Sequence, residues 1–210
     1  MKIKMFLFLV LTVLFVFLIN LSNQDKEIYY LNIDTTNSLS YNKEIYHKLK
    51  NNNKLEKYIN FFSKKDYRTT DLINDINNNK KVNNQTIQNA LIKADMLTLY
   101  VGINDLNYKI NSSKEELYEY TDQVLEDMEK LLKLIRIYCK EKIYVIGYKN
   151  NKGVSYDEYF KYVNKIIKSI CDEYNIIFID INNNENIIDK IFSKWYNDKE
   201  VKLWKIQVQK

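Results

Sequence analysis

The chain has 210 residues, with 32 basic and 27 acidic side chains and a net charge of +5. Lysine alternates with acidic residues along most of the chain, and only Arg68 and Arg136 are arginine. This argues against a nucleic-acid-binding protein, because such proteins cluster their basic residues and favour arginine. Cys139 and Cys171 form no CxxC pair and are far in sequence from the single histidine, His47. The sequence therefore predicts no metal site and no cofactor, and leaves open two buried thiols or one disulfide.

The first 24 residues combine a basic start with a long apolar run. Lys2 and Lys4 precede residues 5–19, in which a single threonine is the only polar side chain. No small-x-small cleavage site and no lipobox cysteine follow, which favours an uncleaved membrane anchor over residues 1–24. The positive-inside rule places Lys2 and Lys4 in the cytoplasm and the domain on the extracytoplasmic side. The alternative is a cleaved signal peptide and a secreted domain.

Residues 25–210 are long enough for one domain with a sizeable core. In chain order the patterns predict a strand at residues 27–33, a helix at 43–50, a strand at 55–62, helices at 70–77 and 86–94 around an Asn- and Lys-rich loop, a strand at 96–101, a long helix at 115–139, a strand at 142–147, a helix at 156–174, a strand at 176–181 and a helix at 187–195. The strand runs are apolar rather than alternating, as expected for a sheet covered on both faces. Together these elements predict a single three-layer α/β domain with a mainly parallel five-stranded sheet.

The strand at residues 96–101 leads directly into Gly102, Asn104 and Asp105, although the chain has only three glycines. Beyond the carboxyl end of a strand is where parallel sheets place their functional residues. On spacing alone, the two polar side chains would cap the turn and satisfy its main-chain groups.

The segment VGINDL resembles the Gly-x-Asn-Asp block of the SGNH hydrolases, also called GDSL esterases and lipases. The segments YRTTDLINDI, ALIKADMLTLYVGINDL, EKIYVIGYKN and YNIIFIDI resemble other parts of that family in the same order, over roughly residues 27–185. The resemblance implies an SGNH-hydrolase-like, flavodoxin-like fold and ester hydrolysis. It also implies that Gly102 and Asn104 form the oxyanion position, where Asn104 donates to the developing oxyanion, and that Asp105 braces the turn.

Two catalytic blocks of the family are not recognisable. The Gly-Asp-Ser block should follow the first strand, where the chain reads YYLNIDTTNSLS. Read directly off the strand, the block falls at residues 32–34 or 33–35, which include Asp34 and Thr35 but no serine. Shifted along the chain, it falls at residues 36–39 with Ser38 as the nucleophile. The Asp-x-x-His block near the C-terminus has no counterpart, and His47 lies on an early helix where a surface position is expected.

A hydroxyl nucleophile is weak without a base beside it, and loss of the histidine from a Ser-His pair can cost roughly a million-fold in turnover. We therefore predict a catalytically degraded SGNH-like domain, a pseudoenzyme that acts as a binding or accessory protein at the bacterial cell envelope. Its candidate ligand is a cell-wall glycan or acylated polymer. The alternative is a divergent esterase or lipase that acts on acyl esters, with Ser38 or Thr35 as nucleophile and Asn104 in the oxyanion hole. A third hypothesis is an inert paralogue.

Overall fold

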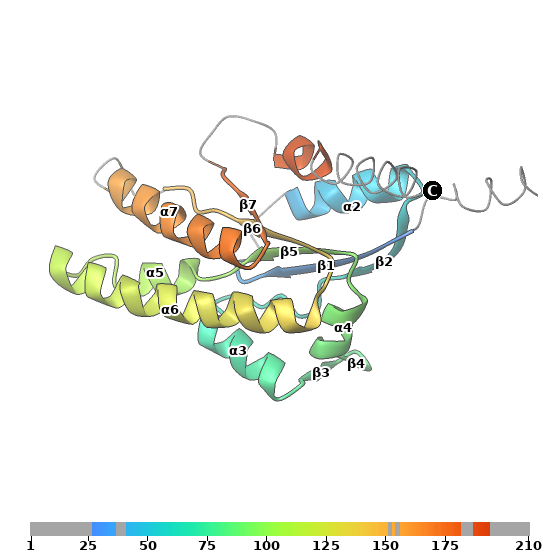
Figure 1. Ribbon diagram of the computed structural model, residues 1–210, viewed down its shortest axis with the longest axis horizontal. Helices are drawn as coiled ribbons and strands as arrows, with labels where there is room; N and C mark the ends of the chain where they lie inside the picture. The colour runs from blue at the N-terminus through green and yellow to red at the C-terminus, as the bar shows by residue number, and fades with distance from the viewer. Residues whose placement is uncertain (1–26, 37–40, 151–152, 154–155, 182–186, 194–210) are drawn as a thin grey trace, which may run out of the picture.

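The computed structural model describes residues 27–36, 41–150, 153, 156–181 and 187–193 (Figure 1). The predicted membrane segment, residues 1–24, lies outside this range. Within it, no helix combines the length and the apolar character needed to cross a bilayer.

The elements in chain order are β1 (Ile28–Asp34), α2 (Tyr41–Asn51), β2 (Leu55–Ile59), α3 (Thr69–Asn77), β3 (Lys81–Val82), β4 (Gln85–Thr86), α4 (Ile87–Lys93), β5 (Met96–Tyr100), α5 (Ile103–Tyr108), α6 (Lys114–Tyr138), β6 (Lys142–Ile146), α7 (Asp157–Glu173) and β7 (Ile177–Ile179). Residues 187–193 form a further helix.

The main sheet has the strand order β2-β1-β5-β6-β7, and every neighbouring pair is parallel. The central strands β1 and β5 are buried at every position, because helices cover both faces of the sheet. This confirms the predicted three-layer α/β domain with a parallel five-stranded sheet.

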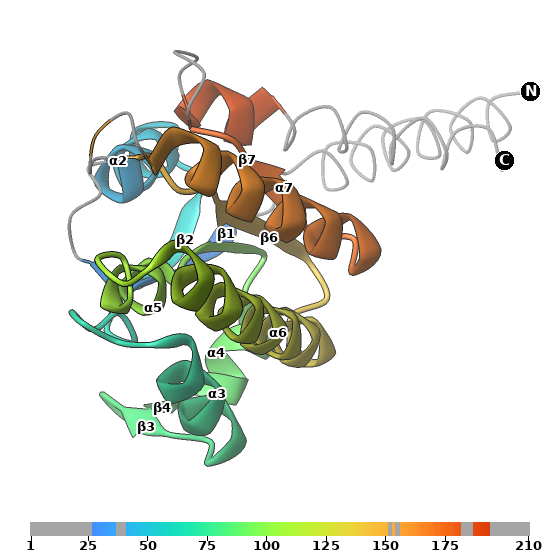
Figure 2. The same ribbon diagram turned by 90° about the vertical axis from the view of Figure 1, so that its left-hand side faces the viewer.

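Two helical layers enclose the sheet (Figure 2). On one face, α2 lies beside the helix at residues 187–193, where Lys48 Nζ is 3.1 Å from Asp189 Oδ1 and 4.7 Å from the ring centre of Phe192. On the other face, α6 contacts α3, α4 and α7. The arrangement follows from the right-handed crossovers that parallel strands require.

The long helix α6 begins and packs as its sequence predicts. Ser113 is the N-cap, and its Oγ accepts a hydrogen bond from the Glu116 main-chain nitrogen at 3.3 Å. Its apolar positions, including Leu131, are buried against the sheet and the neighbouring helices. Burying a leucine side chain contributes roughly 1.5 to 3 kcal/mol, so this face anchors the layer.

Two short elements differ from the sequence prediction. The Asn- and Lys-rich loop contains the hairpin β3-β4, whose turn places Asn83 and Asn84 at φ values of 48° and 61°. Asparagine tolerates this left-handed conformation better than most residues do, and two-residue hairpin turns require it. The second element is α5, which begins directly after Gly102, so Asn104 and Asp105 lie in the first turn of a helix and not in an open turn.

Candidate active site

The strand order has one point at which the chain reverses its direction of progress across the sheet. From β1 the chain moves outward to β2, and from β5 it moves the other way through β6 to β7. The carboxyl ends of β1 and β5 are therefore the topological switch point, where parallel α/β sheets bind ligands. Register pairing puts Asp34 beside Tyr100 at this end. Both predicted site segments, residues 34–36 and 102–105, emerge here.

Asp34 holds the turn that follows β1. Its Oδ1 accepts from the main-chain nitrogen and the hydroxyl of Thr36, at 2.7 and 2.8 Å, and its Oδ2 accepts from Asn42 Nδ2 at 3.3 Å. Its own main-chain nitrogen donates to Ser63 Oγ at 2.9 Å. The side chain is buried, and both carboxylate oxygens are hydrogen-bonded inside the fold. This carboxylate shapes the turn and is already committed to neutral donors.

Thr35 has no exposed surface. Its main-chain nitrogen and its hydroxyl both donate to the Tyr100 carbonyl, at 3.0 and 3.3 Å. A nucleophilic hydroxyl must face the substrate and pass its proton to a base. The Thr35 hydroxyl instead directs its proton to a main-chain carbonyl oxygen.

At the end of β5, the backbone conformation and the close packing at position 102 require a residue without a side chain. The Gly102 φ of +92° lies in the left-handed region that side chains with a Cβ avoid. A Cβ at this position would also lie 2.6 Å from Met128 Cε and against the Tyr148 hydroxyl. That hydroxyl donates to the Val101 carbonyl, which fixes it over the turn. The glycine therefore allows both the chain reversal and the close approach of α6.

Asn104 joins three segments of the site. Its Nδ2 donates to the Thr35 carbonyl at 3.1 Å and to the Tyr67 carbonyl at 2.9 Å. Only the amide nitrogen of an asparagine can donate to carbonyl oxygens, so the amide group must be oriented with Nδ2 toward these two carbonyls. Each of the two amide hydrogens has a main-chain acceptor. Stabilising an oxyanion would require at least one of these bonds to break.

Asp105 accepts hydrogen bonds from the first residue of α3. Its Oδ2 accepts from the main-chain nitrogen of Thr69, at 2.9 Å, and from the Thr69 hydroxyl, at 3.0 Å. Burial raises the pKa of Asp105, and the two hydrogen bonds from Thr69 act in the opposite direction. The carboxylate thus satisfies a donor that a helix leaves unpaired at its first turn.

Three further residues of the site were not predicted from the sequence. Asn42 and Ser63 hold Asp34, as described above, and Tyr41 adds a buried hydroxyl that has no hydrogen-bond partner among the described residues. Burial raises the pKa of Tyr41, as does the nearby charge of Asp34. Tyr100 lies in the same environment, which raises its pKa to about 12. Tyr41 and Tyr100 therefore both lie close enough to Asp34 for its charge to act on their hydroxyls.

Ser38, His47, Cys139 and Cys171 complete the set of residues singled out in the sequence. Ser38 falls outside the described residues, so its position relative to Asn104 stays untested. His47 is exposed on α2, with its ring centre 5.1 Å from that of Tyr46. Cys139 and Cys171 are buried free thiols. Across the described part of the chain, no group of three or more His, Cys, Asp or Glu side chains is placed to hold a metal ion.

Residues 21–202 match the protein family described as GDSL-like Lipase/Acylhydrolase. The chain belongs to this family. Seventeen chains from solved structures also match this protein. Axe2, an acetylxylan esterase from Geobacillus stearothermophilus, is 15% identical with a TM-score of 0.53, over 75% of this chain and 76% of that one. The acetyl xylan esterase AlAXEase is 13% identical with a TM-score of 0.52, over 80% and 83% of the two chains. A search of curated protein sequences returned no match.

The site can be compared with the GDSL family in two respects: where its turns lie, and what their polar groups bind. The turn after β1 and the Gly-x-Asn-Asp turn after β5 meet at the switch point, as the family resemblance implies. The groups at these turns are engaged with each other, through Asn104 and the Thr35 carbonyl. The oxyanion role of Asn104 and the nucleophile roles of Thr35 and Ser38 stay predictions.

Proposed function

We propose that this GDSL-family domain does not hydrolyse esters and instead binds an acylated saccharide at the cell envelope. The observation that carries the proposal is the Thr35 hydroxyl, which is fully buried and donates to the Tyr100 carbonyl. The Asn104 amide supports it, because both of its hydrogens are bound to main-chain carbonyls. The single imidazole of the sequence, His47, is exposed on α2 and is not part of the turns that form the switch point.

An exposed aromatic residue on the rim of the site supports a binding role. Tyr108 ends α5 and is 61% exposed, and the Arg68 guanidinium lies 4.3 Å from its ring centre. Arg68 follows Tyr67, whose carbonyl accepts from Asn104. An exposed aromatic face beside hydrogen-bond donors is suited to a sugar ring. The acetylxylan esterases of similar fold act on acetylated saccharides by name, which makes this ligand class the first to test.

The proposed location is the extracytoplasmic face of a membrane, with residues 1–24 as the anchor. The apolar run at residues 5–19 and the preceding lysines support this orientation. Secretion after signal cleavage is the second candidate. Protease treatment of intact protoplasts, followed by fractionation, separates the two. Recovery of only a soluble protein without residues 1–24 would exclude the anchor.

The alternative function is a divergent esterase that uses Thr35 or Ser38, and it is favoured by the position of Thr35 at the switch point. The test assays the purified full chain on nitrophenyl acetate and acetylated xylo-oligosaccharides, beside Thr35→Ala and Ser38→Ala. We expect no turnover above the buffer rate and no labelling by a fluorophosphonate probe. Turnover that one of the two hydroxyl variants abolishes would establish the esterase and identify its nucleophile.

The binding half of the proposal needs its own measurement. Calorimetric titration with acetylated and deacetylated xylo-oligosaccharides should give binding that depends on the acetyl groups. Tyr108→Ala should weaken it about fivefold, which corresponds to ~1 kcal/mol of aromatic contact. Tyr162→Ala, a half-buried tyrosine on α7, is the matched control. No binding of either oligosaccharide would exclude this ligand class.

A further inference from the structure

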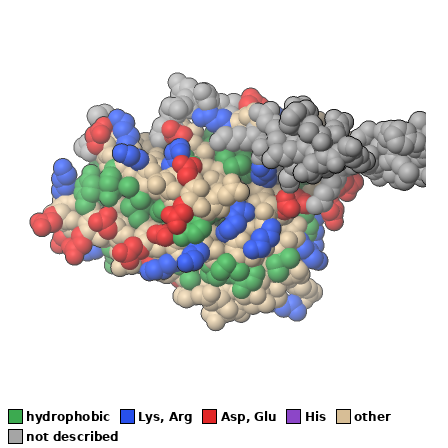
Figure 3. Space-filling model, in the orientation of Figure 1, with side chains coloured by type: hydrophobic (Ala, Val, Ile, Leu, Met, Phe, Trp, Pro, Cys, Tyr) green, Lys and Arg blue, Asp and Glu red, His purple; other side chains and the backbone are tan. Residues whose placement is uncertain are grey.

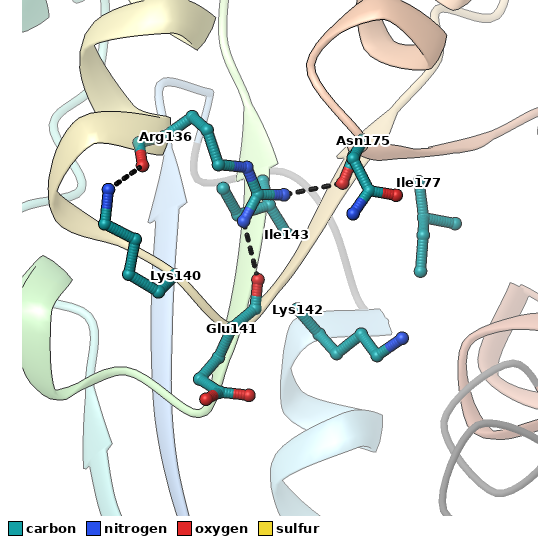
Figure 4. A pocket seen from close by; sticks show the side chains of 7 residues that line it. All are labelled: Arg136, Lys140, Glu141, Lys142, Ile143, Asn175 and Ile177. Carbon is teal, nitrogen blue, oxygen red and sulfur yellow. Dashed lines mark hydrogen bonds between the residues drawn. The ribbon is translucent and has the colours of Figure 1, made fainter. Parts of the chain in front are cut away.

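The end of the domain opposite the switch point carries a basic pocket of about 250 Å³. It lies where β6 and β7 begin and where α6 and α7 end (Figure 4). Its lining residues are Arg136, Lys140, Glu141, Lys142, Ile143, Asn175 and Ile177. Three of these are cationic and one is anionic, so the pocket has an excess of two positive charges.

The guanidinium of Arg136 is fixed in the wall of this pocket. Its Nε donates to the Tyr174 carbonyl at 3.1 Å, and its Nη1 donates to the Cys139 and Glu141 carbonyls at 3.1 and 2.9 Å. Its Nη2 donates to the Asn175 carbonyl at 2.6 Å. These acceptors are neutral, so the positive charge of Arg136 is held in place without a carboxylate partner among its hydrogen bonds.

Two exposed apolar side chains lie at the same end of the domain as the basic pocket. Ile137, next to Arg136, is 56% exposed, and Ile92 at the end of α4 is 61% exposed. The ends of the two helices meet, because Cys139 Sγ lies 3.9 Å from the Ala94 carbonyl. Figure 3 shows hydrophobic and basic side chains together over the C-terminal half of α6 and over α4. Large apolar residues flanked by lysines are typical of surfaces that enter the interface of a lipid bilayer.

The chain that precedes β1 enters the domain at the same end. The Asp95 nitrogen donates to the Tyr29 carbonyl at 3.0 Å, and the Lys142 nitrogen donates to the Asp95 carbonyl at 3.4 Å, so the starts of β1, β5 and β6 lie in one row. Neighbouring strands are about 4.8 Å apart, which puts the start of β6 about 10 Å from that of β1.

The length of the connection limits how far this end can be from a membrane. The apolar run ends at residue 19 and β1 begins at Ile28, so eight residues, 20–27, connect them. Eight extended residues span about 30 Å at most. If residues 5–19 lie in a bilayer, the basic pocket is confined near the lipid headgroups.

We propose that this end of the domain, with the basic pocket, Ile92, Ile137 and Lys93, docks on the surface of a bilayer that contains anionic phospholipids. The cations bind headgroup phosphates, and the two isoleucines enter the interface. The inference rests on the proposed membrane anchor. Docking would direct the switch point, at the opposite end of the sheet, away from the membrane and toward ligands in the envelope.

The test uses the full chain carrying Ile137→Cys, labelled with an environment-sensitive fluorophore and reconstituted into vesicles. The native thiols Cys139 and Cys171 are buried, and labelling of the unsubstituted chain measures their background. Vesicles of phosphatidylcholine are compared with vesicles that also contain phosphatidylglycerol. We expect a blue shift and a gain in fluorescence only with the anionic lipid, reversed by salt because exposed charges are screened over about 10 Å.

Matched variants assign the effect to this surface. Lys93→Glu/Lys140→Glu should abolish the shift, whereas Lys65→Glu/Lys114→Glu, with the same change in net charge at the other end of the domain, should keep it. A fluorophore on Glu115→Cys, about 35 Å away along α6, should not respond. Inorganic phosphate added to the neutral vesicles should not reproduce the shift. A response to phosphate alone would replace the bilayer with a small anion.

Flotation with phosphatidylcholine vesicles reports the anchor separately. A chain that floats with neutral vesicles but shows no shift with anionic ones is anchored and does not dock, which overturns the proposal. A fluorescence shift with anionic vesicles, without flotation on neutral vesicles, supports docking and contradicts the proposed anchor. A chain that does neither contradicts both.

Discussion

The side-chain amide of Asn104 donates to the main-chain carbonyl of Thr35 at 3.1 Å, and so ties the turn after β5 to the turn after β1. The second amide hydrogen reaches the Tyr67 carbonyl, in the loop between β2 and α3. One residue therefore holds together the three segments that surround the switch point. Both amide hydrogens are engaged in this structure, so one of the two bonds would have to break before Asn104 could donate to an oxyanion.

Replacing Asn104 should destabilise the protein. Asn104→Ala removes two hydrogen bonds, at a cost of about 1 to 3 kcal/mol. The buried Thr35 carbonyl keeps its bond from the Asp66 main-chain nitrogen, at 3.1 Å, and the Tyr67 carbonyl loses its bond from Asn104. Asn104→Asp should cost more, because it places a carboxylate against two carbonyl oxygens. Urea unfolding monitored by circular dichroism measures both. Asn111→Ala, on an exposed loop, should change stability by less than about 0.5 kcal/mol. An Asn104→Ala protein as stable as the parent would mean that these bonds contribute nothing.

Gly102→Ala tests the turn at the same place. The substitution strains a left-handed backbone and drives a methyl group into Met128 and Tyr148, so we expect a loss of about 2 to 4 kcal/mol. The double variant Gly102→Ala/Met128→Ala should recover part of the steric cost, although Met128→Ala is itself destabilising. Gly153→Ala, also at positive φ but with no atom near its Cβ position, isolates the backbone component. Equal losses at Gly102 and Gly153 would exclude the packing explanation.

Most of the fold was predictable because its signals are local. Four of the five strands are mainly apolar runs, and α6 carries both an N-cap serine and a helical apolar period. The edge strand β2, which reads LEKYI, has two exposed charged residues at its centre. The structure places the five strands and α6 within one to three residues of the prediction. The short helix α5 was missed because its start depends on the conformation of Gly102 and not on an apolar pattern. The hairpin β3-β4 has only two residues per strand, and its one local signal was the pair Asn83-Asn84.

The site was predictable only in part. The positions of Asp34, Thr35 and Asn104 follow from strand ends and the family resemblance. The engagement of the Asn104 amide does not, because its acceptors are 69 and 37 residues away in sequence. The roles of Asn42 and Ser63 depend in the same way on tertiary contacts that leave no mark on spacing. The sequence thus predicted two turns that the structure brings side by side, and the structure shows which hydrogen bonds their side chains make.

Leu131→Ala tests the packing of α6 against the sheet. Leu131 has no exposed surface, so its truncation should cost about 2 to 5 kcal/mol through lost contacts and a residual cavity. Lys133→Ala, two residues along on the exposed face, should change stability by less than about 0.5 kcal/mol. Urea unfolding gives both values. A Leu131→Ala loss below that of the control would mean that this face of α6 is loosely packed.

Asp105 should make the stability of the protein depend on pH with a defined sign. Burial raises its pKa above the ordinary value of 3.8, so the folded state holds the proton more tightly than the unfolded state does. The stabilisation from the protonated form is complete below the unfolded pKa and is lost as pH rises through the raised folded pKa.

The variant Asp105→Asn replaces the titrating carboxyl group with an amide, which does not titrate but keeps an oxygen for the Thr69 donors. The stability of the parent minus that of Asp105→Asn should therefore fall as pH rises above the ordinary carboxyl pKa of 3.8. Urea unfolding at a series of pH values measures the difference, and Glu119→Gln, which removes an exposed carboxylate, is the control. A difference that rises with pH would mean that the hydrogen bonds from Thr69 outweigh burial and that Asp105 stabilises the fold as an ion.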